Sequence, residues 1–376
     1  MVRLLIAGDF APKNRIAEMM EKSDYSFFEE VRQCTSQVDY SILNLECPIA
    51  DENCKPIIKS GPNLKCSPKV LDAIKFGGFD GVTLANNHFR DYGDRSVLMT
   101  LKALDDTHID WVGGGNTLRN SRLPLFVRIK EKNVGIVNVC EREFSIATKF
   151  TAGAAPIDLI DTQRTIAYCK TQADYVIVIT HGGHELHQLP SPMMQKTYRW
   201  FIDMGADAVV NHHQHCYSGY EIYNEKPIFY GLGNFCFDKP VYRNSVWNEG
   251  FMVVLNLADK IGFDLIPYVQ CDETPTIRLK NESEIEEFNH SIAALNNIIA
   301  DPLLVEADFE RYCKASQKRV LGLLSPLSNR YLRGAAQKGL IPFFLSKKRI
   351  ARIFDNINCD AHRNIILRCL YEAIGQ

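Results

Sequence analysis

Histidine and other metal-ligand residue types gather in short clusters along the first 240 residues, and each cluster follows an apolar run. The clearest cluster is Asn211-His-His-Gln-His215, directly after Ala208-Val-Val. If the extended conformation continues past this run, His213 and His215 leave the strand on the same side. A single buried histidine is often a hydrogen-bonded core residue, but three within four positions favour ligands of a metal cluster.

Two carboxylates stand in similar positions. Asp9 follows an apolar run at the start of the chain, and Glu46 ends a second strand pattern that Pro48 terminates. A glutamate at a strand end can bridge two cations, because each carboxylate oxygen can face one ion. The simpler interpretations are a turn residue for Asp9 and a solvated strand end for Glu46, and the neighbouring clusters weigh against both.

The segment Asn86-Asn-His-Phe-Arg-Asp91 follows another short apolar run. Asn87 offers a neutral carbonyl oxygen, which leaves a bound ion a stronger Lewis acid than another carboxylate would. His88 cannot easily reach the same ion, so it is better suited to contact a substrate or to protonate a leaving group. Asp91 is a candidate to orient His88.

The elements that carry these clusters alternate between strand and helix patterns from residue 1 to about 240. This alternation predicts an α/β fold with a mainly parallel or mixed sheet and helices on its faces. The clusters then lie at the carboxyl ends of strands, where open α/β sheets bind ligands. We expect a hairpin over 125–140 that turns at Lys132-Asn133, and an exposed rim loop over 51–68.

Composition and charge indicate an ordinary globular protein. The chain has 376 residues, of which 46% are hydrophobic and 23% charged. It opens directly into a strand pattern and contains no run of about 20 apolar residues, so we expect a cytoplasmic protein. Its 12 cysteines form no CxxC pair, which argues against a zinc ribbon or a disulfide framework.

The C-terminal region differs from the rest of the chain. No acidic residue lies between Glu310 and Asp355, whereas eleven basic residues do. The rest of the chain therefore carries a formal net charge of about -13. We expect a core domain over 1–275 and a basic helical region over 282–376. Its basic face could be solvated, could lie against the acidic core, or could contact an anionic membrane surface through 338–352. Nucleic acid is not expected, because aromatic residues do not interleave with the bases.

Six motifs occur in an order that closely resembles the CapA family of capsule, or poly-γ-glutamate, synthesis proteins, which has the calcineurin-like metallophosphoesterase fold. The motifs are Gly8-Asp9, Asn44-Leu-Glu46, Leu84-Ala-Asn-Asn-His-Phe-Arg-Asp-Tyr-Gly93, His181-Gly-Gly-His-Glu185, His212-His-Gln-His215 and Lys226-Pro-Ile-Phe-Tyr-Gly-Leu-Gly-Asn-Phe235. The resemblance covers roughly residues 1 to 270.

The resemblance implies a four-layer α/β/β/α sandwich with two divalent metal ions, Mn, Fe or Zn, at the strand ends. Asp9 and His215 would hold one ion, Asn87, His181 and His213 the other, and Glu46 would bridge them. Ala11 stands where the wider fold often has a histidine, so the first site should be poorer in ligands. His88 and Asp91 would act in catalysis. The residues expected to contact the substrate are Asn86, Glu185, His212 and Asn234.

Two functions remain open at this stage. A hydrolase of capsule or exopolymer synthesis would use the two ions to activate water against a phosphoester or a polyglutamate-type amide. A non-catalytic capsule-assembly factor would instead bind an anionic polymer in the same cleft.

Overall fold

The computed structural model describes residues 1–376 except 325, 326, 328, 343, 347, 351, 352, 354–356, 358–369 and 371–376. The chain forms two compact units, Met1–Val305 and Glu306–Gln376. Helix α8 (Glu282–Ile299) belongs to the first unit, because its Phe288 and Ile292 are buried in the core of that unit. The region expected to begin at residue 282 therefore includes one helix that packs with the preceding domain.

The first of two large sheets has eight strands in the order β16-β15-β14-β1-β2-β3-β4, with β13 paired to β1. Its strands are β1 (Val2–Phe10), β2 (Tyr40–Leu45), β3 (Gly81–Thr83), β4 (Asp110–Val112), β13 (Asn234–Cys236), β14 (Glu249–Leu257), β15 (Gly262–Gln270) and β16 (Ile277–Leu279). Strands β1 to β4 run parallel, so their carboxyl ends meet at one edge.

The second sheet has six strands in the order β11-β12-β10-β9-β7-β6. Its strands are β6 (Leu125–Ile129), β7 (Lys132–Cys140), β9 (Tyr175–His181), β10 (Ala208–His212), β11 (Tyr220–Tyr223) and β12 (Lys226–Phe229), and a small separate sheet joins β5 (Gly114–Gly115) to β8 (Gly153–Ala154). The four central strands are parallel, whereas β6 and β11 pair antiparallel at the edges.

The hairpin expected over residues 125–140 is present as β6 and β7, but its turn was placed wrongly. Ile129 pairs with Lys132, so the turn residues are Lys130 and Glu131 rather than Lys132 and Asn133. Lys130 adopts the left-handed conformation, with φ 53°, that two-residue hairpin turns require at their first central position. Asparagine is the more usual residue in that conformation, which explains why the pattern pointed two residues too far along the chain.

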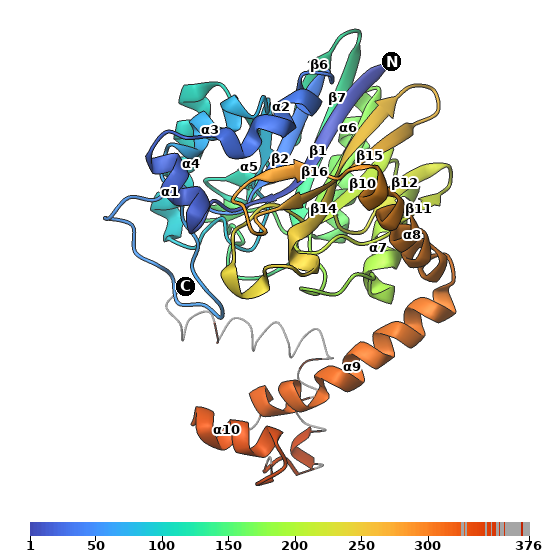
Figure 1. Cartoon of the computed structure of the whole chain (residues 1–376). Coiled ribbons are helices and arrows are strands. Elements are labelled where there is room, and N and C mark those ends of the chain that lie inside the picture. Colours follow the sequence, from blue (N-terminus) through green and yellow to red (C-terminus); the bar gives the residue numbers. More distant parts are fainter. Residues whose placement is uncertain are drawn as a thin grey trace. The chain divides into compact units, whose positions relative to one another are not determined.

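Helices cover the outer faces of both sheets (Figure 1). Over both units, the helices of the described residues are α1 (Arg15–Glu21), α2 (Glu29–Thr35), α3 (Val70–Phe76), α4 (Gly93–Thr107), α5 (Leu118–Ser121), α6 (Leu159–Gln172), α7 (Pro192–Asp203), α8, α9 (Pro302–Leu324) and α10 (Arg330–Gln337), with single 3-10 turns at Ser26–Phe28, Pro240–Tyr242 and Val246–Asn248. Helices α2 and α4 contact strands of the first sheet, whereas α6, α7 and α8 contact strands of the second.

The alternation of side chains along each central strand creates the layers. In β1, Leu4 and Ile6 belong to one buried cluster, whereas Leu5 and Ala7 belong to the cluster that includes the helices. Successive side chains of a strand point to opposite faces, so the first cluster fills the space between the sheets and the second packs beneath the helices. This arrangement is the predicted α/β/β/α sandwich.

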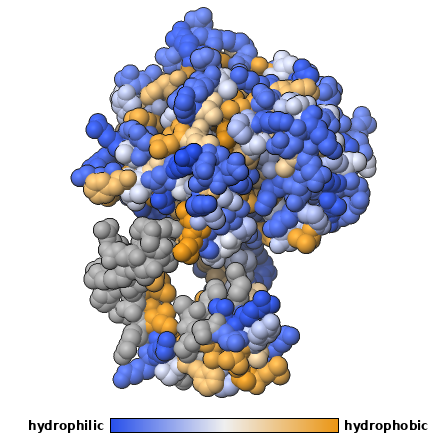
Figure 2. All heavy atoms as spheres, turned by 90° about the vertical axis from the view of Figure 1, so that its left-hand side faces the viewer, coloured by the Kyte–Doolittle hydropathy of each residue, from blue (hydrophilic) through white to orange (hydrophobic). Residues whose placement is uncertain are grey.

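The described part of the C-terminal unit contains most of α9 and all of α10. Two of the eleven basic residues counted between Glu310 and Asp355, Lys347 and Arg352, lie outside the described residues, as does Asp355 itself. The expected contact of residues 338–352 with a membrane surface therefore stays a prediction. Within the described residues, no helix combines the length and the hydropathy needed to cross a bilayer. On the face drawn in Figure 2, apolar side chains are scattered among hydrophilic ones.

We expect Ile177→Ala to lower the free energy of unfolding by about 2–5 kcal/mol, because it leaves a cavity between the sheets. Tryptophan fluorescence during chemical denaturation measures this, since Trp111, Trp200 and Trp247 all lie in the first unit. The matched control is Ile222→Ala, whose side chain is 55% exposed and should change the value by no more than about 0.5 kcal/mol. Equal effects of the two substitutions would contradict the layered packing.

Candidate metal centre

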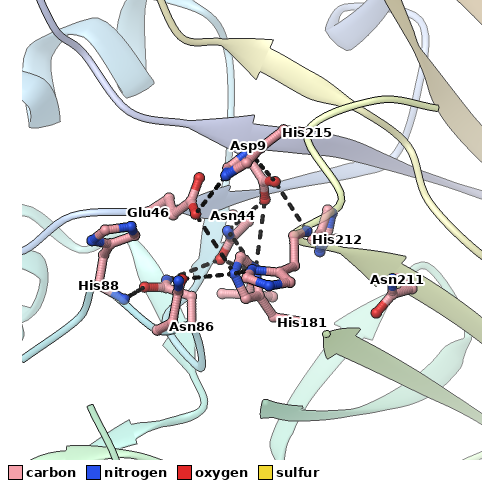
Figure 3. A network of polar contacts seen from close by, with 12 residues as sticks. Asp9, Asn44, Glu46, Asn86, His88, His181, Asn211, His212 and His215 are labelled. Carbon is pink, nitrogen blue, oxygen red and sulfur yellow. Dashed lines mark hydrogen bonds and ion pairs between the residues drawn. The ribbon is translucent and has the colours of Figure 1, made fainter. Parts of the chain in front are cut away.

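All six predicted metal ligands converge where the two sheets present the carboxyl ends of their parallel strands. Asp9 lies near the end of β1 and His181 ends β9, while the loops after β2, β3 and β10 supply the remaining ligands, Glu46, Asn87, His213 and His215. Figure 3 shows Asp9, Glu46, His181 and His215 pointing toward one another, whereas Asn211 lies apart. The five strands therefore bring the six predicted ligands together.

The first group of ligand atoms centres on His181. Its Nε2 lies 3.0 Å from Asn87 Oδ1 and 3.1 Å from His213 Nδ1. Glu46 Oε1 lies 3.6 Å from the same nitrogen. Atoms about 3 to 3.5 Å apart have the spacing of ligands held about 2.1 Å from one tetrahedrally coordinated ion. These four side chains can therefore bind one cation.

The second group consists of Asp9, Glu46 and His215. His215 Nδ1 lies 3.8 Å from Asp9 Oδ2, and His215 Nε2 lies 3.9 Å from Glu46 Oε1. His215 Nδ1 is also 2.9 Å from Asn234 Oδ1, an outer partner that fixes the imidazole ring and leaves Nε2 toward Glu46. The buried Ala11 adds no ligand, so this group is poorer than the first by one residue, in line with the expectation from the sequence.

Glu46 belongs to both groups, and its environment fits cations. Its side chain is fully buried, and neither carboxylate oxygen has a hydrogen-bond partner among the described residues. A buried ionised carboxylate is strongly destabilising unless a positive charge compensates it. Glu46 Oε1 lies 3.6 Å from His181 Nε2 and 3.9 Å from His215 Nε2, so cations in the two groups would compensate the buried charge, and the residues present fit a dinuclear site.

Burial sets the protonation states at this centre. It lowers the pKa of His213 and of His215 to about 3 and lowers that of His181 well below its usual value. The imidazoles are therefore neutral, which is the form that binds metal. Burial raises the pKa of Asp9 to about 7 and that of Glu46 well above its usual range, with the Asp9 charge adding to the shift at Glu46. A bound cation would lower both pKa values, because it stabilises the charged form of each carboxylate.

The backbone that carries His213 and His215 is not extended. Strand β10 ends at His212, and both histidines adopt positive φ values, 93° and 56°. The prediction that a continuing strand aims both rings was wrong, because a left-handed turn replaces the strand at this point. The backbone N–H of His213 donates to Asp9 Oδ2 at 3.1 Å, which ties the turn to β1. Positive φ in residues other than glycine is uncommon and concentrates at functional sites.

Asn44 was not among the predicted site residues, yet it holds Asp9 in place. Its Nδ2 donates to Asp9 Oδ1 at 2.7 Å, and the two residues are direct neighbours in the register of β1 and β2. The side chain of Asn86 donates to Asn44 Oδ1 and to the Leu45 carbonyl, and it accepts from the His88 backbone N–H. Asn44 could have been found from its strand, because it shares a face with Glu46.

Three of the four residues expected to contact a substrate are buried and hydrogen-bonded within the protein. Asn86, His212 and Asn234 are at most 1% exposed. His212 Nε2 bonds to the Ala7 carbonyl, and Asn234 donates to the carbonyls of His215 and Trp247. A substrate contact does not fit Asn86 or Asn234, because their polar atoms are already bonded within the protein.

Glu185 is the only one of these four with an exposed side chain. Burial raises the pKa of Glu46 and of Glu143, and the negative charge of Glu185 adds to both shifts and opposes the lowering of the His213 pKa by burial. Glu143, which the sequence analysis missed, places Oε1 3.7 Å from His213 Nε2 and accepts a hydrogen bond from Asn87. It is an outer carboxylate partner for a ligand histidine.

His88 and Asp91 lie beside the ligands, as expected. His88 Nδ1 is 2.6 Å from Asp91 Oδ2, and burial lowers the pKa of this imidazole. The loop over residues 51–68, expected to be an exposed rim, sends Lys59 inward, and its Nζ lies 2.6 Å from Asp91 Oδ1. Nothing in the spacing of the sequence distinguished Lys59 from its exposed neighbours.

Residues 3–239 match the family model described as bacterial capsule synthesis protein PGA_cap. The chain belongs to this family. Two curated relatives are the capsule biosynthesis protein CapA of Bacillus anthracis, 32% identical over 251 residues (63% of this chain and 60% of the relative), and the PGA biosynthesis protein CapA of Bacillus subtilis, 31% identical over 238 residues (62% of each). The chain therefore aligns with less than two thirds of either relative.

Solved structures that superpose on this chain include a phosphatase from Mycoplasma pneumoniae. The match has a TM-score of 0.48 and 14% sequence identity, and it covers 77% of this chain and 98% of that one. A putative 5′-nucleotidase from Staphylococcus aureus gives TM-score 0.46 and 14% identity, with coverage of 79% and 58%.

We expect Glu46→Gln to weaken metal binding by more than about tenfold, because Glu46 is shared by both ligand groups and its replacement is uncharged. His215→Ala should affect one group only. Elemental analysis after dialysis and calorimetric titration with Mn²⁺ or Zn²⁺ measure both effects. The matched control is Glu185→Gln, an exposed glutamate beside the centre, which should keep the wild-type metal content. Unchanged metal binding by Glu46→Gln would contradict the bridging role.

Metal binding should release protons, and the metal affinity should fall as the pH falls through about 7. Asp9 has a raised pKa of about 7 in the metal-free chain, so at about pH 6 its carboxyl group is mostly protonated and must lose that proton to bind a cation. Titrations in buffers of different ionisation enthalpy count the released protons. We expect more release at about pH 6 than at about pH 8.5, and equal release at both would contradict the assignment of Asp9.

Proposed function

We propose that this protein is a metal-dependent hydrolase of capsule or exopolymer synthesis, which cleaves a phosphoester or a polyglutamate-type amide bond. One observation carries the proposal: the two carboxylate oxygens of Glu46 are buried without hydrogen-bond partners among the described residues, where two groups of metal-ligand side chains meet. The family membership and the capsule-related names of both Bacillus relatives support the biological setting.

When bound, two divalent cations would supply Lewis-acid polarisation of the electrophile and an activated water nucleophile. The chain's own residues prepare the site for this chemistry. Glu46 and Asp9 provide negative charge, and the neutral imidazoles of His181, His213 and His215 add ligands without offsetting it. Asn44 and Asn234 hold Asp9 and His215, so the ligands need little rearrangement when a substrate binds.

His88 is placed to act on the leaving group. Asp91 binds its Nδ1, which leaves Nε2 as the ring nitrogen that can bond to a substrate oxygen or nitrogen. The ring lies next to the ligand Asn87 in sequence but makes no ligand contact itself among the described residues. His88 can therefore hold a hydrogen bond to the atom on which negative charge develops.

Positive charge beside the second ligand group supports an anionic substrate. The ammonium group of Lys239 lies 4.7 Å from the ring centroid of Trp247, and this ring packs on His215 with 4.7 Å between centroids. A phosphoryl group or a glutamate chain carries the complementary charge.

We expect His88→Asn to lower kcat by about 10²–10⁴-fold while metal content stays at the wild-type value, because His88 contacts the leaving group and is not a ligand. The assay uses the Mn²⁺-loaded chain with bis(p-nitrophenyl) phosphate and with poly-γ-glutamate, and metal content is measured on the same samples. His290→Asn, a change on the exposed part of α8, should leave kcat unchanged.

Hydrolysis of neither substrate by the metal-loaded wild-type chain would contradict the hydrolase proposal. Retention of poly-γ-glutamate by that inactive chain would instead support a capsule-assembly factor that binds an anionic polymer.

A further inference from the structure

The Lys59 side chain is buried, although most residues of its loop, 51–68, are exposed. The side chain is only 2% exposed, although the preceding Ile58 is 69% exposed and Lys55 in the same loop is also exposed. Gly61, with φ 83°, provides the left-handed turn that reverses the loop just beyond Lys59. The loop thus presents one ammonium group to the interior.

The ammonium group lies at the meeting point of three residues of the β3–α4 connection. Lys59 Nζ is 2.6 Å from Asp91 Oδ1, 3.2 Å from His88 Nδ1 and 3.3 Å from the Asn87 carbonyl oxygen. The Asp91 side chain is fully buried, so this ion pair is shielded from water. A shielded pair of this kind is strongly coupled, and loss of either partner leaves the other charge uncompensated.

Asp91 connects this loop to His88. Its Oδ2 accepts from Leu64 N at 2.7 Å and lies 2.6 Å from His88 Nδ1, while its backbone carbonyl accepts from Ile57 N and from Asn63 Nδ2, both at 2.9 Å. The loop and the imidazole therefore share one carboxylate. Because Lys59 binds Oδ1, the other oxygen is fixed toward His88.

We propose that Lys59 is a positioning residue for His88: through Asp91 it holds the imidazole with Nε2 toward the leaving group, and it makes this orientation depend on the loop over residues 51–68. The inference rests on the proposed hydrolase function for its consequence in catalysis. The contact between Lys59, Asp91 and His88 stands independently of that function.

The burial of Lys59 is hard to explain by folding alone. Apolar residues of similar size often replace buried ion pairs without loss of stability. A loop that served only as a cover could close over Asp91 with its backbone donors Ile57 N and Leu64 N. The ammonium group adds a fixed charge at the one carboxylate that orients His88, which is the contribution a positioning residue makes.

The first test compares Lys59→Met, Lys59→Arg and the matched control Lys55→Met on aryl phosphodiesters whose leaving groups differ in pKa. A displaced His88 weakens the bond to the leaving oxygen, so Lys59→Met should lower kcat by about tenfold or more on the poorest leaving group and much less on the best. KM should change less than about twofold. Lys59→Arg keeps the charge and should recover part of the loss, and Lys55→Met should match the wild type.

An equal loss of kcat for every leaving group, or a rise in KM with kcat unchanged, would overturn the proposal and assign Lys59 to substrate binding instead. If tryptophan fluorescence shows that the Lys59→Met chain does not fold, Lys59→Gln takes its place in the same series, because glutamine keeps a polar group near Asp91.

The second test needs no activity. In protein labelled with ¹⁵N-histidine, the ring nitrogen signals of His88, assigned with His88→Asn, should shift or broaden in Lys59→Met and stay in place in Lys55→Met. Unmoved His88 signals in Lys59→Met would overturn the proposal. Shifted signals together with an inactive wild-type chain would contradict the hydrolase function while leaving the positioning contact intact.

Discussion

The buried carboxylate of Glu46 is the constraint on which the rest of the site depends. It is fully enclosed, and no described donor bonds to either of its oxygens. Asp9 lies in the same desolvated space, and the neighbouring histidines are held neutral by the same burial. Two acidic groups among uncharged imidazoles are destabilising without a cation and become favourable with one. The surrounding asparagines hold the ligands in place in the folded chain. Binding of a cation therefore orders these side chains little further and loses little conformational entropy.

The two-sheet fold supplies this arrangement by topology. Parallel strands of both sheets end at one edge, and the register places Asn44 and Asn234 on either side of Asp9, and His181 beside His212. Close packing is needed where β1 meets the chain before β13, because a Cβ on Gly8 would lie 2.1 Å from the Gly233 carbonyl oxygen. The glycine there lets the strand carrying Asp9 approach the strand that carries Asn234.

Much of the fold and the ligand set could be predicted because both depend on local patterns. Apolar runs that end in Asp9, Glu46 or His181 indicate buried strands with ligands at their ends, and the six ordered motifs indicate the family. The partners of these ligands depend on contacts between distant segments. Asn138 on β7, for example, accepts from the backbone N–H groups of Leu84 and Ala85 and so positions the Asn87 loop. No spacing along the chain identifies it.

The same limit explains the wrong expectations. The direction of the His213 side chain was predicted from a continuing strand. Its backbone is left-handed instead, and the His213 N–H bonds to Asp9, which comes from another part of the chain. Asn86 and Asn234 resemble substrate contacts in the sequence because they are polar and lie inside the motifs. Their burial is visible only when the packing is known. Lys59 is the converse case, a loop lysine whose ion pair with Asp91 takes it out of solvent.

The most direct test of the central claim is X-ray diffraction from crystals of the Mn²⁺-soaked chain, with anomalous differences collected at the manganese edge. We expect two anomalous peaks, one on each side of Glu46, each about 2.0–2.3 Å from one of its carboxylate oxygens. Diffraction with no anomalous peak at Glu46, or with manganese bound only elsewhere on the chain, would contradict it.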